Sequence, residues 1–135
     1  MATQILIMVL LVLLSAFFSA TETAFSSLNK TRLKSMSENG NRKAERALRL
    51  AENYDELLST ILIGNNIVNI GLASIATIFF VDLLGGGAGP SVSTIVTTVV
   101  VLIFGEISPK SMAKESPESF AMAVSGIISA LTEVF

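Results

Sequence analysis

Oxygen-bearing side chains recur at three places within otherwise apolar stretches of this 135-residue chain. The first group consists of Ser15, Ser19, Glu22 and Ser26. Its spacings of four, three and four residues place all its members on one face of a helix. The second group consists of Asn65, Asn66 and Asn69, of which at least two share a helical face. The third group is the segment 105–109, which contains Gly105, Glu106 and Pro109.

The three groups offer hydroxyl, amide, carboxylate and carbonyl oxygens, which are the donors that hard cations such as Mg²⁺, Ca²⁺ or Na⁺ prefer. The chain contains no Cys and no His, so thiolate ligands, imidazole ligands and imidazole catalysis are excluded. It also lacks a glycine-rich phosphate loop, and we expect no enzyme. Because Mg²⁺ requires nearly octahedral oxygen coordination, several facing helices must contribute donors.

Pro109 strengthens the third group as a candidate. Proline has no N–H, and its ring collides with the carbonyl four residues earlier, which belongs to Gly105. We therefore expect Pro109 to interrupt its helix and to leave the Gly105 carbonyl without its helical donor. Transporters use unwound carbonyls of this kind to hold cations.

Small polar residues also join membrane helices without binding anything. We assign Ser15 to this structural role, whereas for Ser19 and Ser26 both interpretations stay open. For the three asparagines, hydrogen bonds between helices compete with ion binding, and we favour binding because three amides within five residues are costly in an apolar span.

A carboxylate at membrane depth is a functional candidate by default, which favours Glu22 and Glu106. Both lie late in their apolar stretches, and Lys110 is four residues after Glu106. A simple ion pair at the helix end is therefore the competing explanation for Glu106.

The composition indicates the elements that carry these groups. Hydrophobic residues make up 51% of the chain and charged residues only 15%, against about 25% in soluble domains. We predict an all-α membrane protein, because apolar spans must close their backbone hydrogen bonds internally. The expected membrane helices are 2–28, 56–81 and 91–105, and the expected juxtamembrane amphipathic helices are 30–53 and 117–135. A cleaved signal peptide is the alternative for the first, but no basic residue precedes it.

The basic residues predict the topology. Seven of the nine Lys and Arg residues lie between Lys30 and Arg49, and the other two are Lys110 and Lys114. The positive-inside rule places these on the cytoplasmic side, with the N-terminus and a flexible GGGAGP loop (85–90) outside. The cluster lies between apolar spans and has no aromatic stacking platform, so we expect no nucleic-acid partner.

Local signals divide the polar segments. Asn39-Gly40 predicts a turn, and Asn41 a helix N-cap. Ser116-Pro117 predicts the start of the last helix, 117–135. We prefer an interfacial position for this helix because it is amphipathic, although its length also permits a crossing.

The segments SATETAFSS, IGNNIVNIG and FGEISPK, in this order on successive spans, resemble the transmembrane domain of the CorC/CNNM family of magnesium transporters. The resemblance covers essentially the whole chain. It implies three membrane helices, a belt of juxtamembrane helices, a homodimer in membrane lipid, and Mg²⁺ export from the cytoplasm in exchange for Na⁺. In a bacterium, the location would be the inner membrane.

The resemblance also implies a set of cation ligands in the three groups. These are Ser19, Glu22, Ser26, Asn65, Asn66, Asn69, Gly105, Glu106 and Pro109. Hydroxyl and amide oxygens and the Gly105 carbonyl are expected as direct ligands, while the carboxylates set the electrostatic field or serve the coupling ion. Family members continue into cytosolic CBS modules that bind nucleotide, so we expect this chain to be the membrane part of a longer protein.

Two other functions remain open. A membrane anchor that senses a cation for cytosolic domains would need the same site as a transporter. A purely structural anchor would use the polar groups only to hold helices together, and no cation would then affect its stability.

Overall fold

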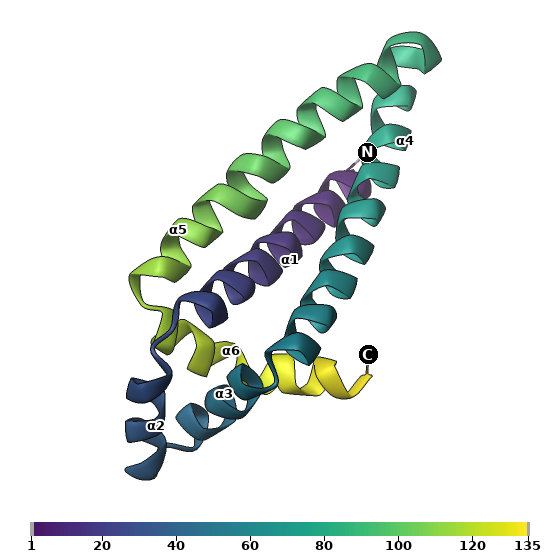
Figure 1. Ribbon diagram of the computed structural model, residues 1–135. Coiled ribbons are helices and arrows are strands. Elements are labelled where there is room, and N and C mark those ends of the chain that lie inside the picture. Colours follow the sequence, from purple (N-terminus) through teal and green to yellow (C-terminus); the bar gives the residue numbers. More distant parts are fainter. Residues whose placement is uncertain (1, 135) are drawn as a thin grey trace. The chain divides into compact units, whose positions relative to one another are not determined.

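The computed structural model describes the backbone of residues 2–134 and the side chains of residues 2–132, and this part of the chain contains helices but no strand. The elements are α1 (Ala2–Ser27), α2 (Lys30–Glu38), α3 (Arg42–Glu52), α4 (Tyr54–Val100), the π-helix η1 (Val101–Ile107), α5 (Ser108–Glu115) and α6 (Pro117–Val134) (Figure 1). The all-helical prediction is confirmed. Phe135, the last residue of the predicted helix 117–135, lies outside the described residues.

Two continuous helical stretches, Ala2–Ser27 and Tyr54–Glu115, are long and apolar enough to cross a membrane by length and composition. Their large apolar side chains are widely exposed, for example Ile70 at 67% and Ile95 at 64%. Exposed apolar surface of this extent is typical of helices whose surroundings are themselves apolar.

The chain divides into two compact units, and each is described by itself. The first unit comprises residues 1–19 and 65–109, and the second comprises residues 20–64 and 110–135. Helices α1, α4 and α5 each contribute to both units.

In the first unit, the beginning of α1 packs along α4. Leu11 Cδ1 lies 3.9 Å from the point where a β-carbon on Gly71 would be, and the Ser15 hydroxyl donates to Asn65 Oδ1 at 3.3 Å. The later residue of α1 meets the earlier residue of α4, so the two helices run antiparallel.

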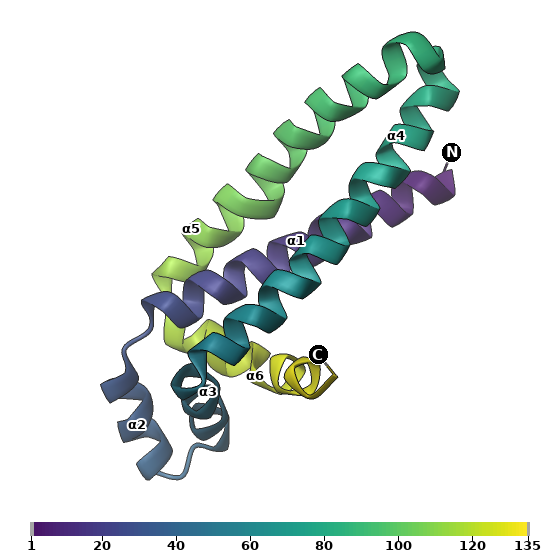
Figure 2. The ribbon, with the colours of Figure 1, turned by 45° about the vertical axis from the view of Figure 1, so that its right-hand side comes forward.

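Helix α4 turns back on itself at the glycine-rich segment, and both views show its second part returning alongside its first (Figures 1 and 2). Gly85, with φ 86° and ψ 170°, is the one residue whose dihedrals leave the helical region. The prediction of a flexible GGGAGP loop, with the next helix beginning near Ser91, is therefore wrong. Because glycine tolerates positive φ, a single residue makes the reversal and the helix restarts at once.

Gly89 lets the two parts of this hairpin approach closely. A β-carbon at this position would lie 2.8 Å from Val81 Cα and 2.9 Å from the Phe80 carbonyl oxygen. These atoms belong to the backbone and cannot rotate away. By contrast, a β-carbon on Gly87 would meet no atom within 4 Å.

In the second unit, short helices follow the predicted local signals. Asn41 is the N-cap of α3, and its side-chain oxygen accepts from the Ala44 N–H at 3.1 Å, as predicted. A turn at Asn39 and Gly40, the latter with φ 91°, separates α2 from α3. Helix α3 packs against both α2 and α6. The shared core of small and branched side chains includes Leu33, Ala47 and Ile128.

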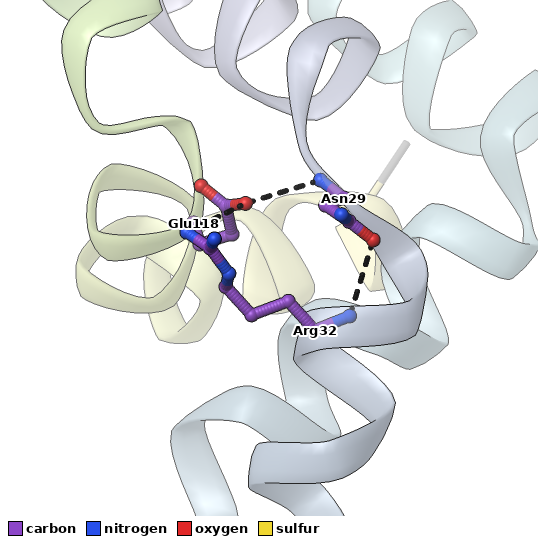
Figure 3. Close-up of polar contacts among 3 residues, drawn as sticks. All are labelled: Asn29, Arg32 and Glu118. Carbon is purple, nitrogen blue, oxygen red and sulfur yellow. Dashed lines mark hydrogen bonds and ion pairs between the residues drawn. The ribbon is translucent and has the colours of Figure 1, made fainter.

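A single carboxylate ties α6 to the junction between α1 and α2. Glu118 Oε1 accepts from the Asn29 N–H at 3.3 Å and lies 3.8 Å from Arg32 Nη1 (Figure 3). Asn29 also caps α2, since its side-chain oxygen accepts from the Arg32 N–H at 3.2 Å. Glu118 is 13% exposed and Arg32 69%, so the hydrogen bond contributes more than the screened ion pair.

The Gly89 contact predicts a position-specific cost. Gly89→Ala should lower the free energy of unfolding by about 1–3 kcal/mol, because overpacking against backbone forces the hairpin apart. Gly87→Ala is the matched control and should leave stability unchanged or slightly raised. Thermal melts of both variants in detergent measure the difference, and equal midpoints would contradict this account of the hairpin.

The Glu118 contacts predict a second effect. Glu118→Ala should lower the free energy of unfolding by about 1 kcal/mol, because the Asn29 N–H loses its acceptor. The exposed Glu115 is the control, since Glu115→Ala removes the same charge without a described contact. If the two substitutions shift the melting temperature equally, the Asn29–Arg32–Glu118 contacts do not hold this junction.

Candidate functional site

Three helical segments of the first unit meet at Ser15. Its side chain is completely buried, and its hydroxyl donates to Asn65 Oδ1 on α4. The same Oγ lies 3.1 Å from the position of a β-carbon on Gly105, which belongs to η1. The Ser15 hydroxyl thus bonds a polar atom of α4 and packs against the backbone of η1 at Gly105.

Gly105 makes this approach possible because it has no side chain. Any other residue would place its β-carbon 3.1 Å from the Ser15 hydroxyl and 3.6 Å from Ser15 Cβ. Because Gly105 lacks a side chain, Ser15 packs directly against the backbone of η1. The close packing therefore depends on this residue type.

The three predicted asparagines do not share one environment. Asn65 and Asn69 are half-buried and follow each other by one helical turn, so they share a face of α4, whereas Asn66 is exposed. Asn69 Oδ1 is a buried oxygen that has no hydrogen-bond partner among the described residues. A buried acceptor without a partner costs about 1–3 kcal/mol, so its presence requires an explanation.

The backbone of the third group forms a π-helix rather than a broken helix. In η1 the Ser108 N–H donates to the carbonyl of Ile103, five residues earlier, and the chain continues directly into α5. The predicted interruption at Pro109 is thus wrong. The π-helical turn immediately before Pro109 accommodates the proline within the continuous helix. Such π-helical segments are rare and frequently occur at functional sites.

The other candidate residues of the first unit are Ser19, Glu106 and Pro109, which are close in sequence to Ser15 or Gly105. Ser19 is one turn after Ser15 on α1 and is 2% exposed. Glu106 is half-buried, and Pro109 is buried. Glu106 is the carboxylate next to Gly105 in the π-helix, which makes it the charged group of this region.

Glu22 and Ser26 belong to the second unit. There Glu22 is half-buried, while Ser26 is exposed and its hydroxyl donates to the Thr23 carbonyl at 3.1 Å. Back-bonding of this kind already uses the single hydroxyl proton of Ser26, although its oxygen can still accept or bind a cation. A role for Glu22 or Ser26 as an ion ligand stays a prediction.

The donor set at Ser15 consists largely of neutral oxygens. Within the described residues, no group of three or more His, Cys, Asp or Glu side chains is close enough to hold a metal. A conventional carboxylate cage is therefore not what this part of the chain provides. Amide and hydroxyl oxygens suit a hard cation that keeps part of its water shell.

A larger cavity of about 450 Å³ lies in the same unit between α1, α4 and η1. Its lining is apolar apart from Thr97, and Phe79 and Phe104 contribute to it. It offers almost no donors to a cation, so the polar atoms around Ser15 are the better candidate despite their smaller space.

Ser15 is predicted to join helices, and its hydrogen bond to Asn65 on α4 agrees with that role. It also packs against Gly105, which spacing along the sequence does not predict. One sequence signal for Ser15 is its position in the polar stripe, one helical turn before Ser19. That Ser15 and Gly105 are neighbours is seen only in the structure.

The comparisons agree with the helical pattern. The family described as Cyclin M transmembrane N-terminal domain matches residues 6–135. A UPF0053 protein of Haemophilus influenzae is 42% identical over 135 residues, covering 100% of this chain and 32% of the relative. The UPF0053 inner membrane protein YfjD of Escherichia coli is 42% identical over 118 residues, covering 87% and 27%.

A third relative carries a functional name. The polyamine export protein of Haemophilus influenzae is 30% identical over 144 residues, covering 97% of this chain and 33% of the relative. The chain thus spans about a third of the length of these relatives. With a family match over residues 6–135, the chain is a membrane domain that belongs to the Cyclin M transmembrane N-terminal domain family, as its resemblance to CorC/CNNM proteins predicted.

Proposed function

We propose that this domain transports Mg²⁺ across the membrane, with the ion held among Ser15, Asn65, Asn69 and the backbone of Gly105. The observation that carries the proposal is the buried Asn69 Oδ1, which lacks a partner among the described residues. Helix packing explains the Ser15–Asn65 hydrogen bond. It does not explain a second amide oxygen, one turn away, that remains unpaired.

Magnesium suits these donors better than most divalent ions. It loses its water reluctantly and is held by few protein ligands, so a sparse set of neutral oxygens and one carboxylate is sufficient. Weak multiple contacts also favour release, which transport requires. Glu106 either supplies the electrostatic field at the site or binds Na⁺ as the coupling ion, so that Na⁺ entry drives Mg²⁺ export.

Polyamine export is a second candidate because one relative carries that name. A polyamine bears several ammonium groups along an extended chain, and each ammonium is best met by a carboxylate or an aromatic face. The polar atoms around Ser15 are compact, and the carboxylate of this part of the chain is Glu106, which follows Gly105 in sequence. This pattern favours a small metal ion.

A cation sensor is the remaining alternative. The domain would then bind the ion and signal to the rest of the protein without moving it. The same ligands serve both functions, so only net ion movement separates them. The π-helix favours transport, because a helix with two hydrogen-bond registers offers an element that can shift between states.

The proposed membrane arrangement follows the basic residues. Three crossings, by α1 and the two parts of α4, would place the N-terminus and the Gly85 turn outside and the Lys30–Arg49 segment in the cytoplasm. Helices α2, α3 and α6 would form the juxtamembrane belt. A homodimer in a bacterial inner membrane, with cytosolic CBS modules elsewhere in the full-length protein, completes the proposal.

The site predicts which asparagine responds to magnesium. Titrating Mg²⁺ should stabilise the wild-type domain by about 2.7 kcal/mol at a concentration 100 times Kd. Asn69→Ala should abolish most of this response. Asn66→Ala is the matched control, because this exposed amide on the same helix should leave the response intact. Thermal melts in detergent measure both variants.

The same titration separates the candidate ligands. Spermidine and Na⁺ serve as comparisons, and stabilisation by spermidine but not Mg²⁺ would favour polyamine export. A wild-type melt that no cation shifts would contradict ion binding altogether, and an Asn69→Ala variant that responds like wild type would contradict the placement of the site.

The substitution Gly105→Ala tests independently whether the backbone of η1 belongs to the proposed Mg²⁺ site. The added methyl group would crowd the Ser15 hydroxyl, so Mg²⁺ affinity should fall about tenfold or more. Gly71→Ala is the control, since its methyl group would meet Leu11 at an ordinary 3.9 Å. Isothermal titration calorimetry gives both affinities, and an unchanged affinity in Gly105→Ala would exclude the η1 backbone from the site.

A further inference from the structure

A polar pocket of about 210 Å³ lies in the second unit, between α3, α6 and the first turn of α4. Arg46 and Arg49 line it from α3, one helical turn apart on nearly the same face. Ser129 and Thr132 line it from α6, and two leucines form its apolar part. This composition differs from the ion site proposed above, since cationic groups dominate it.

Neither arginine is neutralised within the described part of the chain. The ion pair described for this unit is that of Arg32 with Glu118, and among side chains 2–132 no acidic group lies within 4.0 Å of Arg46 or Arg49. Both arginines are largely exposed. Two adjacent guanidinium groups therefore keep their donors available, and their mutual repulsion favours an anion between or beside them.

Hydrogen bonds and close packing hold the side chains that form the wall of the pocket. Asn53 Nδ2 donates to the Arg49 carbonyl at 3.3 Å, and Thr132 Oγ1 donates to the Ser129 carbonyl at 2.7 Å, so both side chains are fixed on its wall. Arg46 Nη1 lies 3.0 Å from the position of a β-carbon on Gly126. Glycine at this point of α6 is what allows the Arg46 guanidinium to lie so close to the helix.

The charged side chains that line the pocket itself favour a singly charged anion. Glu56, in the first turn of α4, also lines the pocket. Two arginines and one carboxylate leave a formal charge of +1. A phosphodiester carries a single negative charge, and its oxygens fit the planar fork of arginine.

The place of the pocket residues in the chain indicates which kind of molecule carries the phosphodiester. Asn53 and Glu56 flank Tyr54, where the apolar stretch Tyr54–Glu115 begins. The end of a membrane helix lies at the level of lipid headgroups, and basic pockets at this level bind anionic lipids. We propose that the pocket formed by Arg46, Arg49 and Ser129 binds the phosphodiester headgroup of an anionic phospholipid. The pocket is separate from the ion site, so either proposal can fail without the other.

The test compares two double variants that lose the same charge. Arg46→Gln with Arg49→Gln removes the pocket cations, whereas Arg42→Gln with Lys43→Gln removes two exposed cations from the start of the same helix. Native mass spectrometry of each detergent-purified protein, titrated with phosphatidylglycerol or phosphatidylcholine, gives the lipid affinities. Melting curves without lipid verify folding, which should be preserved because all four side chains are exposed.

We expect the wild type to prefer phosphatidylglycerol and the pocket variant to lose about 30-fold in affinity for it. The control variant should stay within about threefold of wild type. Equal losses in both variants would overturn the proposal, because general surface charge would then explain binding. Equal affinity for phosphatidylcholine would overturn the preference for an anionic lipid.

Soluble phosphates distinguish the source of the ligand. Inorganic phosphate and glycerol phosphate, titrated under the same conditions, should bind at least about tenfold more weakly than phosphatidylglycerol, because they lack the apolar chains that hold a lipid at the membrane surface. If either binds as tightly as the lipid and depends on Arg46 and Arg49, the pocket is a soluble-phosphate site and the lipid assignment is wrong.

Discussion

Hydrogen bonding of the backbone is the constraint on which this structure depends. In apolar surroundings each N–H and C=O must find its partner within the chain, so long uninterrupted helices are the available solution. Departures from regular helix are therefore few and costly. In the first unit they are confined to Gly85, which reverses α4, and to η1, where the register changes from four to five residues.

Glycine decides where the helices can approach one another. Gly89 lets the two parts of α4 come together, Gly105 admits the Ser15 hydroxyl, and Gly126 accommodates the Arg46 guanidinium. At each position a methyl group would fall within 3.1 Å of another atom. The chain thus uses the same device to close a hairpin, to pack Ser15 against η1 and to place Arg46 against α6.

The sequence predicted those features that depend on neighbouring residues. Helical content followed from the apolar composition, the start of α3 from Asn41, and the start of α6 from Ser116-Pro117. Features that depend on residues distant in sequence were missed. At the tight reversal the glycine run predicts a flexible loop, because such runs usually indicate flexibility, but one positive φ at Gly85 is sufficient. Pro109 was expected to break its helix, but a π-helical turn before it absorbs the change in register.

At the candidate site, too, features set by neighbouring residues were predicted, and contacts between residues distant in sequence were not. Residue types predicted a hard-cation site, which stays a proposal, and helical spacing indicated that at least two of the three asparagines share a face. Spacing alone did not decide that Asn65 and Asn69 face inward while Asn66 is exposed, because this depends on which face of α4 meets α1. Nor did it predict the contacts that Ser15 makes with residues 50 and 90 positions away.

The central claim is that this membrane domain moves Mg²⁺ through a site containing Asn69. Full-length protein reconstituted in liposomes loaded with a magnesium-sensitive dye tests it directly, with an inward or outward Na⁺ gradient imposed. The account predicts Na⁺-dependent Mg²⁺ movement that is lost in Asn69→Ala and retained in Asn66→Ala. Binding of Mg²⁺ without any net movement under either gradient would contradict transport and favour a sensor.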